Sequence, residues 1–189
     1  MKKINKQPMT LIYPIPAFMV SCGENENEYN IISIAWTGTI CSTPPMCYIS
    51  IRPERHSYDI IKRTKEFVIN YTTKDLLLAM DWSGRNSGSD NKKFEKMKLT
   101  PAKGEMVNCP VIAESPVNIE CRVKDIITLG SHDMFIAEVL NIQVAESYIN
   151  EKTGTINIQN NELIAYSQGN YLELGKIIEQ AGFSIKNKQ

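Results

Sequence analysis

The residues best suited to chemistry cluster in the stretch Arg52-Pro53-Glu54-Arg55-His56-Ser57, which leads into a predicted helix. The planar guanidinium groups of Arg52 and Arg55 match phosphate oxygens, and the unpaired N–H groups of a helix N-terminus also bind anions. Ser57 is expected to cap the helix, with Asp59 in its first turn at the positive end of the helix dipole. The cluster predicts a site for a phosphate-bearing ligand. The alternative is that the arginines are solvated and that Ser57 is only a cap.

Two predicted strands lead to this helix. In residues 31–40 the even positions are mostly large and apolar and the odd positions are small or hydroxylated, which indicates a strand with one face open to a polar ligand. Thr43-Pro44-Pro45 must turn, because proline lacks the N–H that a sheet interior needs. Residues 46–52 alternate again and present on one face Tyr48, Ser50 and Arg52.

The remaining pattern is that of several short strands with few helices between them. Predicted strands cover residues 17–22, 65–71, 117–124, 134–144 and 163–166, and predicted helices cover 74–80, 91–97 and 175–181. The Gly-, Ser- and Asn-rich segment 83–90 is expected to be a loop, and Thr72 or Thr73 is expected to cap the helix that precedes it. Mostly antiparallel short strands predict a closed or split barrel that carries peripheral helices.

Composition excludes several classes of protein. The chain has 189 residues, 42% of them hydrophobic, and a formal net charge of zero, which fits one globular domain over residues 1–189 with a short polar lead at 1–9 and a charged tail at 184–189. Balanced charge gives no reason to expect nucleic acid or a membrane as partner, and no apolar run approaches the roughly 20 residues that span a bilayer.

The cysteines and histidines point to neither a disulfide framework nor a metal site. The five cysteines form no CxxC pair, and the two histidines, His56 and His132, lie far apart without clustered carboxylates. The N-terminus lacks the apolar core of a secretion signal, so a reducing cytoplasm is the expected location.

Several runs of residues together resemble a known family. They include Ala35-Trp36-Thr37-Gly38, Cys41-Ser42-Thr43-Pro44-Pro45-Met46, Ser50 through Tyr58, Ser83-Gly84-Arg85-Asn86-Ser87-Gly88, Asp90 through Phe94, Ser115 through Cys121, Leu129 through Ile136, and Tyr166 through Gly175. This ordered set is similar to the flavin reductase-like, flavoredoxin-type family of FMN-binding split barrels, over roughly residues 14–183. The resemblance implies a six-stranded antiparallel Greek-key split barrel, mainly β with peripheral helices, that pairs as a homodimer with flavin near the interface.

The resemblance also implies roles for particular residues. Arg52, Arg55 and Ser57 would hold the FMN phosphate, with His56 adding its first-turn N–H, and Trp36, Thr37 and Gly38 would line the flavin ring. The remaining cofactor-binding candidates are Asn30, Ser50, Lys93 and Tyr166. Lys92 and Lys93 oppose the dipole of their predicted helix, which indicates that one of them faces an anion; two solvated lysines are the alternative.

His132 is the candidate catalytic residue. It lies in a turn between two predicted strands, where a histidine has no packing duty and loop residues often carry function. In related reductases a Gly-Asp-His turn meets the nicotinamide, whereas here the order is Gly130-Ser131-His132-Asp133. The resemblance therefore implies a flavin- or nicotinamide-contacting histidine, against the alternative of a solvated turn residue.

Three classes of function follow from these residues. The first is an FMN-dependent NAD(P)H oxidoreductase, in which the flavin carries the redox chemistry and the protein orients it. The second is a non-catalytic FMN-holding electron carrier that a partner protein reduces. The third is a small-ligand or structural barrel without redox function. No GxSxG, HExxH or GxGxxG motif occurs, so any NAD(P)H is expected to bind in an open groove over the flavin.

Overall fold

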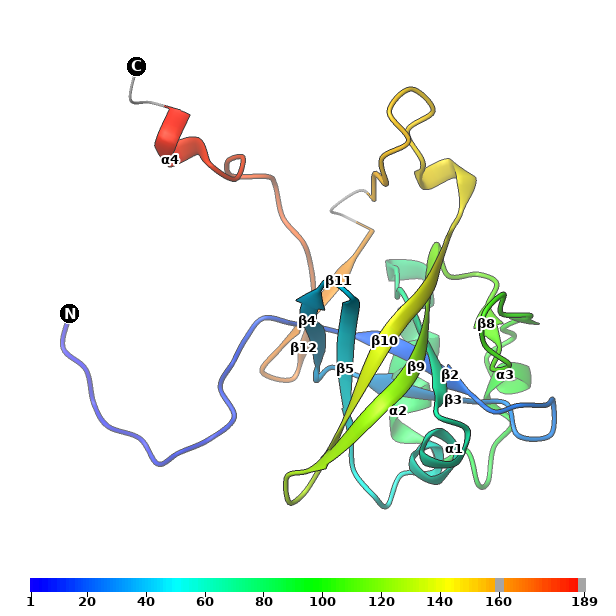
Figure 1. Ribbon diagram of the computed structural model, residues 1–189. Helices are drawn as coiled ribbons and strands as arrows, with labels where there is room; N and C mark the ends of the chain where they lie inside the picture. The colour runs from blue at the N-terminus through cyan, green and yellow to red at the C-terminus, as the bar shows by residue number, and fades with distance from the viewer. Residues whose placement is uncertain (159–161, 187–189) are drawn as a thin grey trace.

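Two long strands, β9 (Val117–Thr128) and β10 (Asp133–Val144), form the centre of a curved antiparallel sheet (Figure 1). The structure is a computed structural model that describes residues 1–158 and 162–186. Within these residues seven strands form one sheet in the order β3-β2-β6-β9-β10-β5-β4. The other five strands are β2 (Phe18–Cys22), β3 (Asn30–Ile34), β4 (Thr37–Ser42), β5 (Pro45–Ile51) and β6 (Glu66–Asn70).

Smaller elements surround this sheet. A second sheet has the order β1-β11-β12, and a third pairs β7 with β8. Their strands are β1 (Ile15–Pro16), β7 (Pro101–Ala102), β8 (Val111–Ile112), β11 (Ile164–Ser167) and β12 (Asn170–Glu173). The helices are α1 (His56–Thr64), α2 (Leu77–Arg85), α3 (Lys93–Lys96) and α4 (Phe183–Lys186), with 3₁₀ turns η1 (Lys74–Leu76) and η2 (Glu146–Tyr148).

The segment 31–40, predicted as one strand, is divided between β3 and β4, and this division allows the sheet to close into a barrel. β3 and β4 lie at opposite ends of the sheet order, yet only Ala35 and Trp36 separate them in the sequence. Two residues span at most about 7 Å, so the two edges of the sheet must lie next to each other. The prediction of one continuous strand is therefore wrong. Trp36, predicted on its apolar face, is 40% exposed, and Ile40 is 47% exposed.

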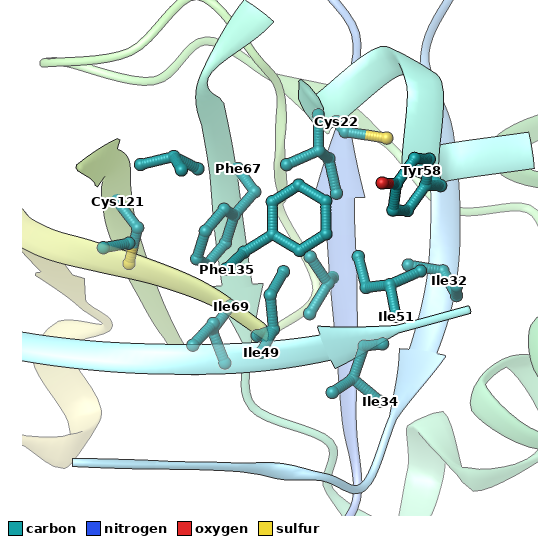
Figure 2. Packing of buried hydrophobic residues seen from close by; sticks show 14 of the residues in the cluster. Cys22, Ile32, Ile34, Ile49, Ile51, Tyr58, Phe67, Ile69, Cys121 and Phe135 are labelled. Carbon is teal, nitrogen blue, oxygen red and sulfur yellow. The ribbon is translucent and has the colours of Figure 1, made fainter. Parts of the chain in front are cut away.

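The barrel interior is filled by alternate residues of the strands. Cys47, Ile49 and Ile51 of β5 point inward, as their alternation predicted, and Phe67 and Phe135 are fully buried beside them (Figure 2). The fold class is confirmed as mainly β, a split barrel with peripheral helices. Its main sheet, however, has seven strands in the described residues, where the sequence predicted six.

Helix ends account for most of the other differences from the sequence predictions. Ser83 and Gly84, expected in a loop, belong to α2, and Gly84 packs against Ser33, where a Cβ atom would lie 3.0 Å from the Ser33 Cβ. Thr73 precedes η1 without a side-chain capping bond. The predicted helix 91–97 is reduced to α3, and the strand predicted at 163–166 is half of the β11–β12 hairpin.

The predicted helix 175–181 does not form; residues 174–182 are exposed, and the short helix lies after them at α4. A seven-residue segment without packing is too short to be a stable helix in water. Residues 187–189 of the predicted charged tail lie outside the described residues. No helix in residues 1–158 and 162–186 is long and apolar enough to span a lipid bilayer.

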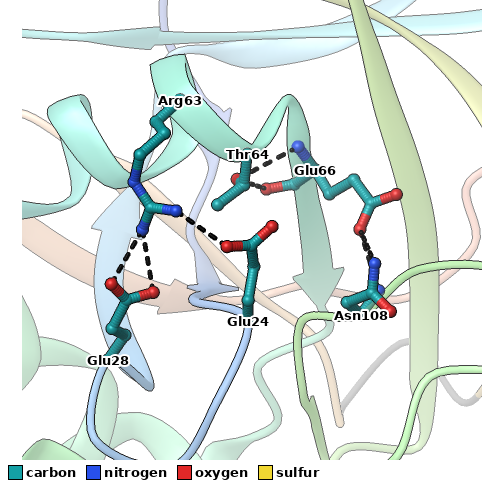
Figure 3. Close-up of polar contacts among 6 residues, drawn as sticks. All are labelled: Glu24, Glu28, Arg63, Thr64, Glu66 and Asn108. Carbon is teal, nitrogen blue, oxygen red and sulfur yellow. Dashed lines mark hydrogen bonds and ion pairs between the residues drawn. The ribbon is translucent and has the colours of Figure 1, made fainter.

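Ion pairs attach the last turn of α1 to the turn between β2 and β3. Arg63, in the last turn of α1, binds Glu24 at 2.7 Å and Glu28 at 2.8 Å, and both glutamates belong to the turn between β2 and β3 (Figure 3). Just beyond the helix, Glu66 accepts a hydrogen bond from the backbone N–H of Asn108 at 2.8 Å. The ion pairs of Arg63 hold the C-terminal end of α1, and the opposite end of the helix borders the candidate site.

Candidate functional site

The N-terminus of α1 has the features that an anion site requires. Arg55 has the extended backbone of an N-cap residue, and no side chain in the described residues caps the helix. The first-turn N–H groups of His56 and Ser57 thus lack the partners that a capping side chain would give. The guanidinium group of Arg55 lies at the same helix end, where the helix dipole also favours negative charge.

Ser57 does not cap this helix, contrary to the sequence prediction. It is the second helical residue and is buried, and its Oγ accepts a hydrogen bond from Asn30 Nδ2 at 2.7 Å. The helix begins two residues earlier than predicted, so the serine faces the start of β3 instead of the helix end. The bond brings two predicted site residues, 27 positions apart, into direct contact.

A cavity of about 130 Å³, here called the helix cavity, opens at this helix end. The predicted site residues that line it are Asn30, Arg55, His56, Ser57 and Lys93. The other lining residues are Ile32, Glu54, Ser83, Gly84, Asn86, Ser87 and Gly88. Glu54 brings a negative charge, but its carboxylate is exposed and pairs with Arg52 at 3.5 Å.

Lys93 is the buried cation of the helix cavity. Its side chain is 3% exposed, and Nζ donates to the carbonyl oxygens of Ile31 and Ser83, both at 2.7 Å. Burial, together with the positive charge of Arg55, lowers the pKa of Lys93 to about 8, although Cys22 acts in the opposite direction. An ammonium group has three N–H donors, so one donor remains for a ligand.

The segment 86–88 also lines this cavity, although none of its residues is a predicted site residue. A Cβ atom on Gly88 would lie 2.2 Å from Asn30 Oδ1, so any larger residue there would force Asn30 or the loop to shift. The same Oδ1 atom is buried and has no hydrogen-bond partner among the described residues. The sequence signal for this part of the cavity was the Gly- and Ser-rich composition of residues 83–90. The same composition is equally typical of an ordinary loop.

A second cavity of about 180 Å³, the hairpin cavity, adjoins the first and shares Ile32 and Arg55 with it. Its lining includes the predicted residues Trp36, Ser50, Arg52 and His132. The register of β10 against β5 pairs Asp133 with Ile51, which brings His132 beside Arg52 across 80 positions of sequence. Strand pairing thus places the predicted catalytic histidine next to the predicted phosphate-binding arginines.

His132 is held as a neutral ring against Trp36. The two ring centroids are 4.4 Å apart, and Nδ1 lies 2.9 Å from the hydroxyl of Ser131. Partial burial and the positive charge of Arg52 lower the pKa of His132 below its usual value, so the ring is uncharged at neutral pH. When Ser131 donates to Nδ1, the ring proton is on Nε2.

A third and larger space, the strap cavity of about 430 Å³, lies between the N-terminal segment 9–13 and the barrel. It shares Ala35, Trp36 and Ser50 with the hairpin cavity, and Thr37 also lines it. Thr37 is buried, and its Oγ1 donates to the carbonyl oxygen of Tyr48 at 2.5 Å. The three cavities therefore form one connected depression around Trp36 and Arg55.

Two predicted site residues line none of these cavities. Gly38 lies in β4 opposite Tyr48, where a Cβ atom would be 3.3 Å from the tyrosine ring. Tyr166 lies in β11, and its ring centroid is 6.2 Å from that of Tyr13, a residue of the strap cavity. Tyr166 thus lies behind the cavity wall in the single chain.

No group of three or more His, Cys, Asp or Glu side chains in the described ranges could hold a metal ion.

The depression suits a long ligand with one anionic end. The anionic end matches the helix cavity, which carries Arg55, Lys93 and helix N–H groups; the orphaned Asn30 Oδ1 would accept from a hydroxyl or an N–H of the ligand. The hairpin cavity offers an indole and a neutral imidazole, which contact a flat ring system well.

Comparisons with known proteins agree with this geometry. Residues 9–175 match the family described as "Flavin reductase like domain". Flavoredoxin of Desulfovibrio vulgaris (Miyazaki F) is 29% identical, with a TM-score of 0.88 over 97% of this chain and 99% of that one. An FMN-binding protein from Thermus thermophilus, 20% identical, has the same fold with a TM-score of 0.80 over 95% of this chain and 99% of that one.

A sequence relative has an assigned activity. The reductase component of 4-nitrophenol 4-monooxygenase/4-nitrocatechol 2-monooxygenase from Rhodococcus opacus is 27% identical over 111 residues, which are 59% of this chain and 56% of that protein.

Proposed function

The chain belongs to the flavin reductase-like family, and on that premise we propose that it is an FMN-binding flavoprotein oxidoreductase that accepts electrons from NAD(P)H. The observation that carries the proposal is the connection of an anion-binding helix end to a cavity walled by Trp36 and the neutral His132, through the shared residue Arg55.

The residues of the site fit FMN. Its phosphate would be held by Arg55, Lys93 and the first-turn N–H groups of His56 and Ser57, with Arg52 as a second guanidinium at the rim. The sugar-alcohol chain would pass Ile32 and Asn30, whose unpartnered Oδ1 is an acceptor for a hydroxyl. The ring would lie by Trp36, Thr37, Ser50 and His132. Bound FMN supplies reversible two-electron chemistry, and these side chains orient it and limit its contact with water.

Two versions of this function differ in the source of electrons. The match to a reductase component of a monooxygenase supports direct reduction by NADH or NADPH. The similarity to flavoredoxin supports the alternative, a non-catalytic FMN-holding carrier that a partner protein reduces. The position of His132 in the lining of the hairpin cavity favours the first version, because a neutral imidazole there can donate to a nicotinamide amide.

One anaerobic experiment separates the versions. The FMN-loaded protein is expected to lose its yellow absorbance with NADH or NADPH alone, and His132→Ala should slow this bleaching without loss of bound flavin. Bleaching by dithionite but by neither nicotinamide would support the carrier. Failure to retain or bind any flavin would refute both versions.

The proposal includes a homodimer and a cytoplasmic location. Residues 1–8 and 174–186 extend away from the barrel (Figure 1) and carry exposed apolar side chains, such as Ile4 at 74% and Ile178 at 97%. A second copy of the chain would cover them. All five cysteines are free thiols, which supports a reducing compartment. Light scattering on the purified protein tests the dimer.

A further inference from the structure

The turn that carries His132 has a hydroxyl group on one side of the histidine and a carboxylate on the other. Asp133, which follows, is buried at the start of β10, and its Oδ2 atom accepts a hydrogen bond from the Tyr58 hydroxyl. Its carboxylate is thus engaged with α1. Ser131, which precedes, is exposed, and its hydroxyl oxygen lies 2.9 Å from Nδ1 of His132. The neighbour that hydrogen-bonds to the imidazole ring is therefore the uncharged serine.

The hydrogen bond between Ser131 and His132 can run in two directions, and the chemistry of the pair favours one of them. A neutral imidazole has one N–H group and one bare nitrogen that accepts. The hydroxyl hydrogen of Ser131 has no other acceptor within residues 1–158 and 162–186. A bare ring nitrogen is a stronger base than a hydroxyl oxygen, so the hydroxyl donates to Nδ1 and the ring hydrogen lies on Nε2.

The charged groups around the ring supply no carboxylate that pairs with it. Partial burial lowers the pKa of His132, the positive charges of Arg52 and Arg55 lower it further, and Glu54 acts in the opposite direction. The Glu54 carboxylate pairs with Arg52 at 3.5 Å, and the Asp133 carboxylate is engaged with α1. The tautomer of the ring is therefore set by the serine and not by an acidic neighbour.

We propose that Ser131 is a positioning residue that keeps an N–H donor on Nε2 of His132 in both charge states of the ring. The protonated ring carries a hydrogen on each nitrogen, and the neutral ring that accepts from Ser131 at Nδ1 has its hydrogen on Nε2. Nε2 is then a donor at every pH. A carboxylate in place of the serine would hold the hydrogen of the neutral ring on Nδ1 and leave Nε2 bare.

The permanent donor serves the hairpin cavity, which His132 lines. The group that would accept from it is a carbonyl oxygen of a bound ligand, such as the carboxamide of a nicotinamide. This use of the donor rests on the proposed function, whereas the tautomer of the ring does not. The tautomer is therefore measured on flavin-free protein and the use of the donor on FMN-loaded protein.

Nitrogen-15 NMR of the imidazole ring measures the tautomer directly. The chain has two histidines, so a His56→Gln background leaves the signals of His132 alone. We expect Nε2–H in the parent at about pH 8, where the ring is neutral. Ser131→Ala should give a mixture of tautomers and raise the pKa of His132 by about 0.3–1, the loss of one hydrogen bond to the neutral ring. Ser131→Thr, which keeps the hydroxyl, should restore both properties, and Ser42→Ala, at an exposed serine of β4, should change neither.

The pH dependence of flavin reduction measures the use of the donor. In FMN-loaded Ser131→Asp the new carboxylate should raise the pKa of His132 by about 1–3. Below the raised pKa the charged ring still has Nε2–H, and above it Nε2 is bare. Reduction by NADH or NADPH should therefore become about two- to tenfold slower than in the parent as the pH rises through that value. Ser131→Thr should follow the parent at every pH.

Two NMR results would overturn the proposal: a parent ring with its hydrogen on Nδ1, or a Ser131→Ala protein whose tautomer and pKa match those of the parent. A Ser131→Asp protein with the pH dependence of the parent would refute the use of Nε2 as a donor during reduction. Failure of NADH and NADPH to reduce any of the proteins would refute the proposed function, while the expected tautomer and its disturbance in Ser131→Ala would still support the positioning role.

Discussion

The hydroxyl of Tyr58 donates a hydrogen bond to Asp133 Oδ2 at 2.5 Å, and both residues are buried. Tyr58 follows Ser57 in α1, and Asp133 follows His132 at the start of β10, so the bond joins the two halves of the site. The bond to the carboxylate, followed by burial, raises the pKa of Tyr58. The ring of Tyr58 also packs edge-on against Phe135 at 5.4 Å, which anchors the pair to the barrel core.

Removal of this bond should destabilise the fold. In Tyr58→Phe a buried carboxylate loses a donor while its other oxygen, Oδ1, already has no partner among the described residues. The free energy of unfolding should fall by about 1–3 kcal/mol, measured by urea denaturation. Tyr13→Phe is the control, because that hydroxyl has no hydrogen-bond partner in the described ranges. Equal stability of the two variants would show that the bond contributes nothing.

Arg55 should be the main anchor of the FMN phosphate. Arg55→Ala removes a charge-assisted hydrogen bond of about 1.5–3 kcal/mol, so the dissociation constant of FMN should rise by at least about tenfold. Riboflavin lacks the phosphate, and its affinity should change little. Lys124→Ala, which removes an exposed cation that pairs with Glu138, serves as the control. Unchanged FMN affinity by fluorescence titration would remove Arg55 from the phosphate site.

FMN affinity should depend on pH through Lys93. Its pKa is lowered to about 8 in the flavin-free protein, and a bound phosphate, dianionic above its second pKa of about 6, would raise that value again. Binding therefore takes up a proton, and affinity should fall about tenfold between pH 7 and pH 9 as the free lysine loses its charge.

Two lysine variants test the origin of this dependence. Lys93→Met should bind FMN more weakly at pH 7 and show a flat profile. Lys92→Met, which removes a neighbouring exposed cation paired with Glu95, should retain the slope of the parent protein. A Lys93→Met protein with the same slope would assign the titration to another group.

Gly88 should tolerate no side chain. In Gly88→Ala the new methyl group would lie 2.2 Å from Asn30 Oδ1, so Asn30 or the loop must move. We expect weaker FMN binding and about 1–3 kcal/mol lower stability, the usual cost of overpacking. Gly175→Ala, where no atom lies within 4 Å of the new Cβ, is the matched control. Normal stability and FMN affinity of Gly88→Ala would show that segment 86–88 rearranges freely.

The sequence by itself determined which residues alternate and which could hold an anion. The period of two in β5 gave the burial of its side chains, because side chains of a strand alternate between faces whatever the strand pairs with. In β9 the same period did not give the burial, since the polar Asn118 and Glu120, expected on a wet face, are buried. The arginines before α1 gave the proposed anion site, because a helix N-terminus attracts anions through its own N–H groups. The ordered runs of residues that resemble the flavin reductase-like family predicted the split barrel.

Only the tertiary structure decided which of these residues meet. The register of β10 on β5 brings His132 to Arg52, and the closing barrel divides residues 31–40 into strands at opposite sheet edges. Ser57 binds Asn30 instead of capping its helix, and Lys93 lies buried against two carbonyl oxygens. The local sequence pattern determines which face of its own helix or strand a side chain lies on. The pairing of strands that are distant in sequence determines which side chains become its neighbours, and this pairing leaves no local period in the sequence.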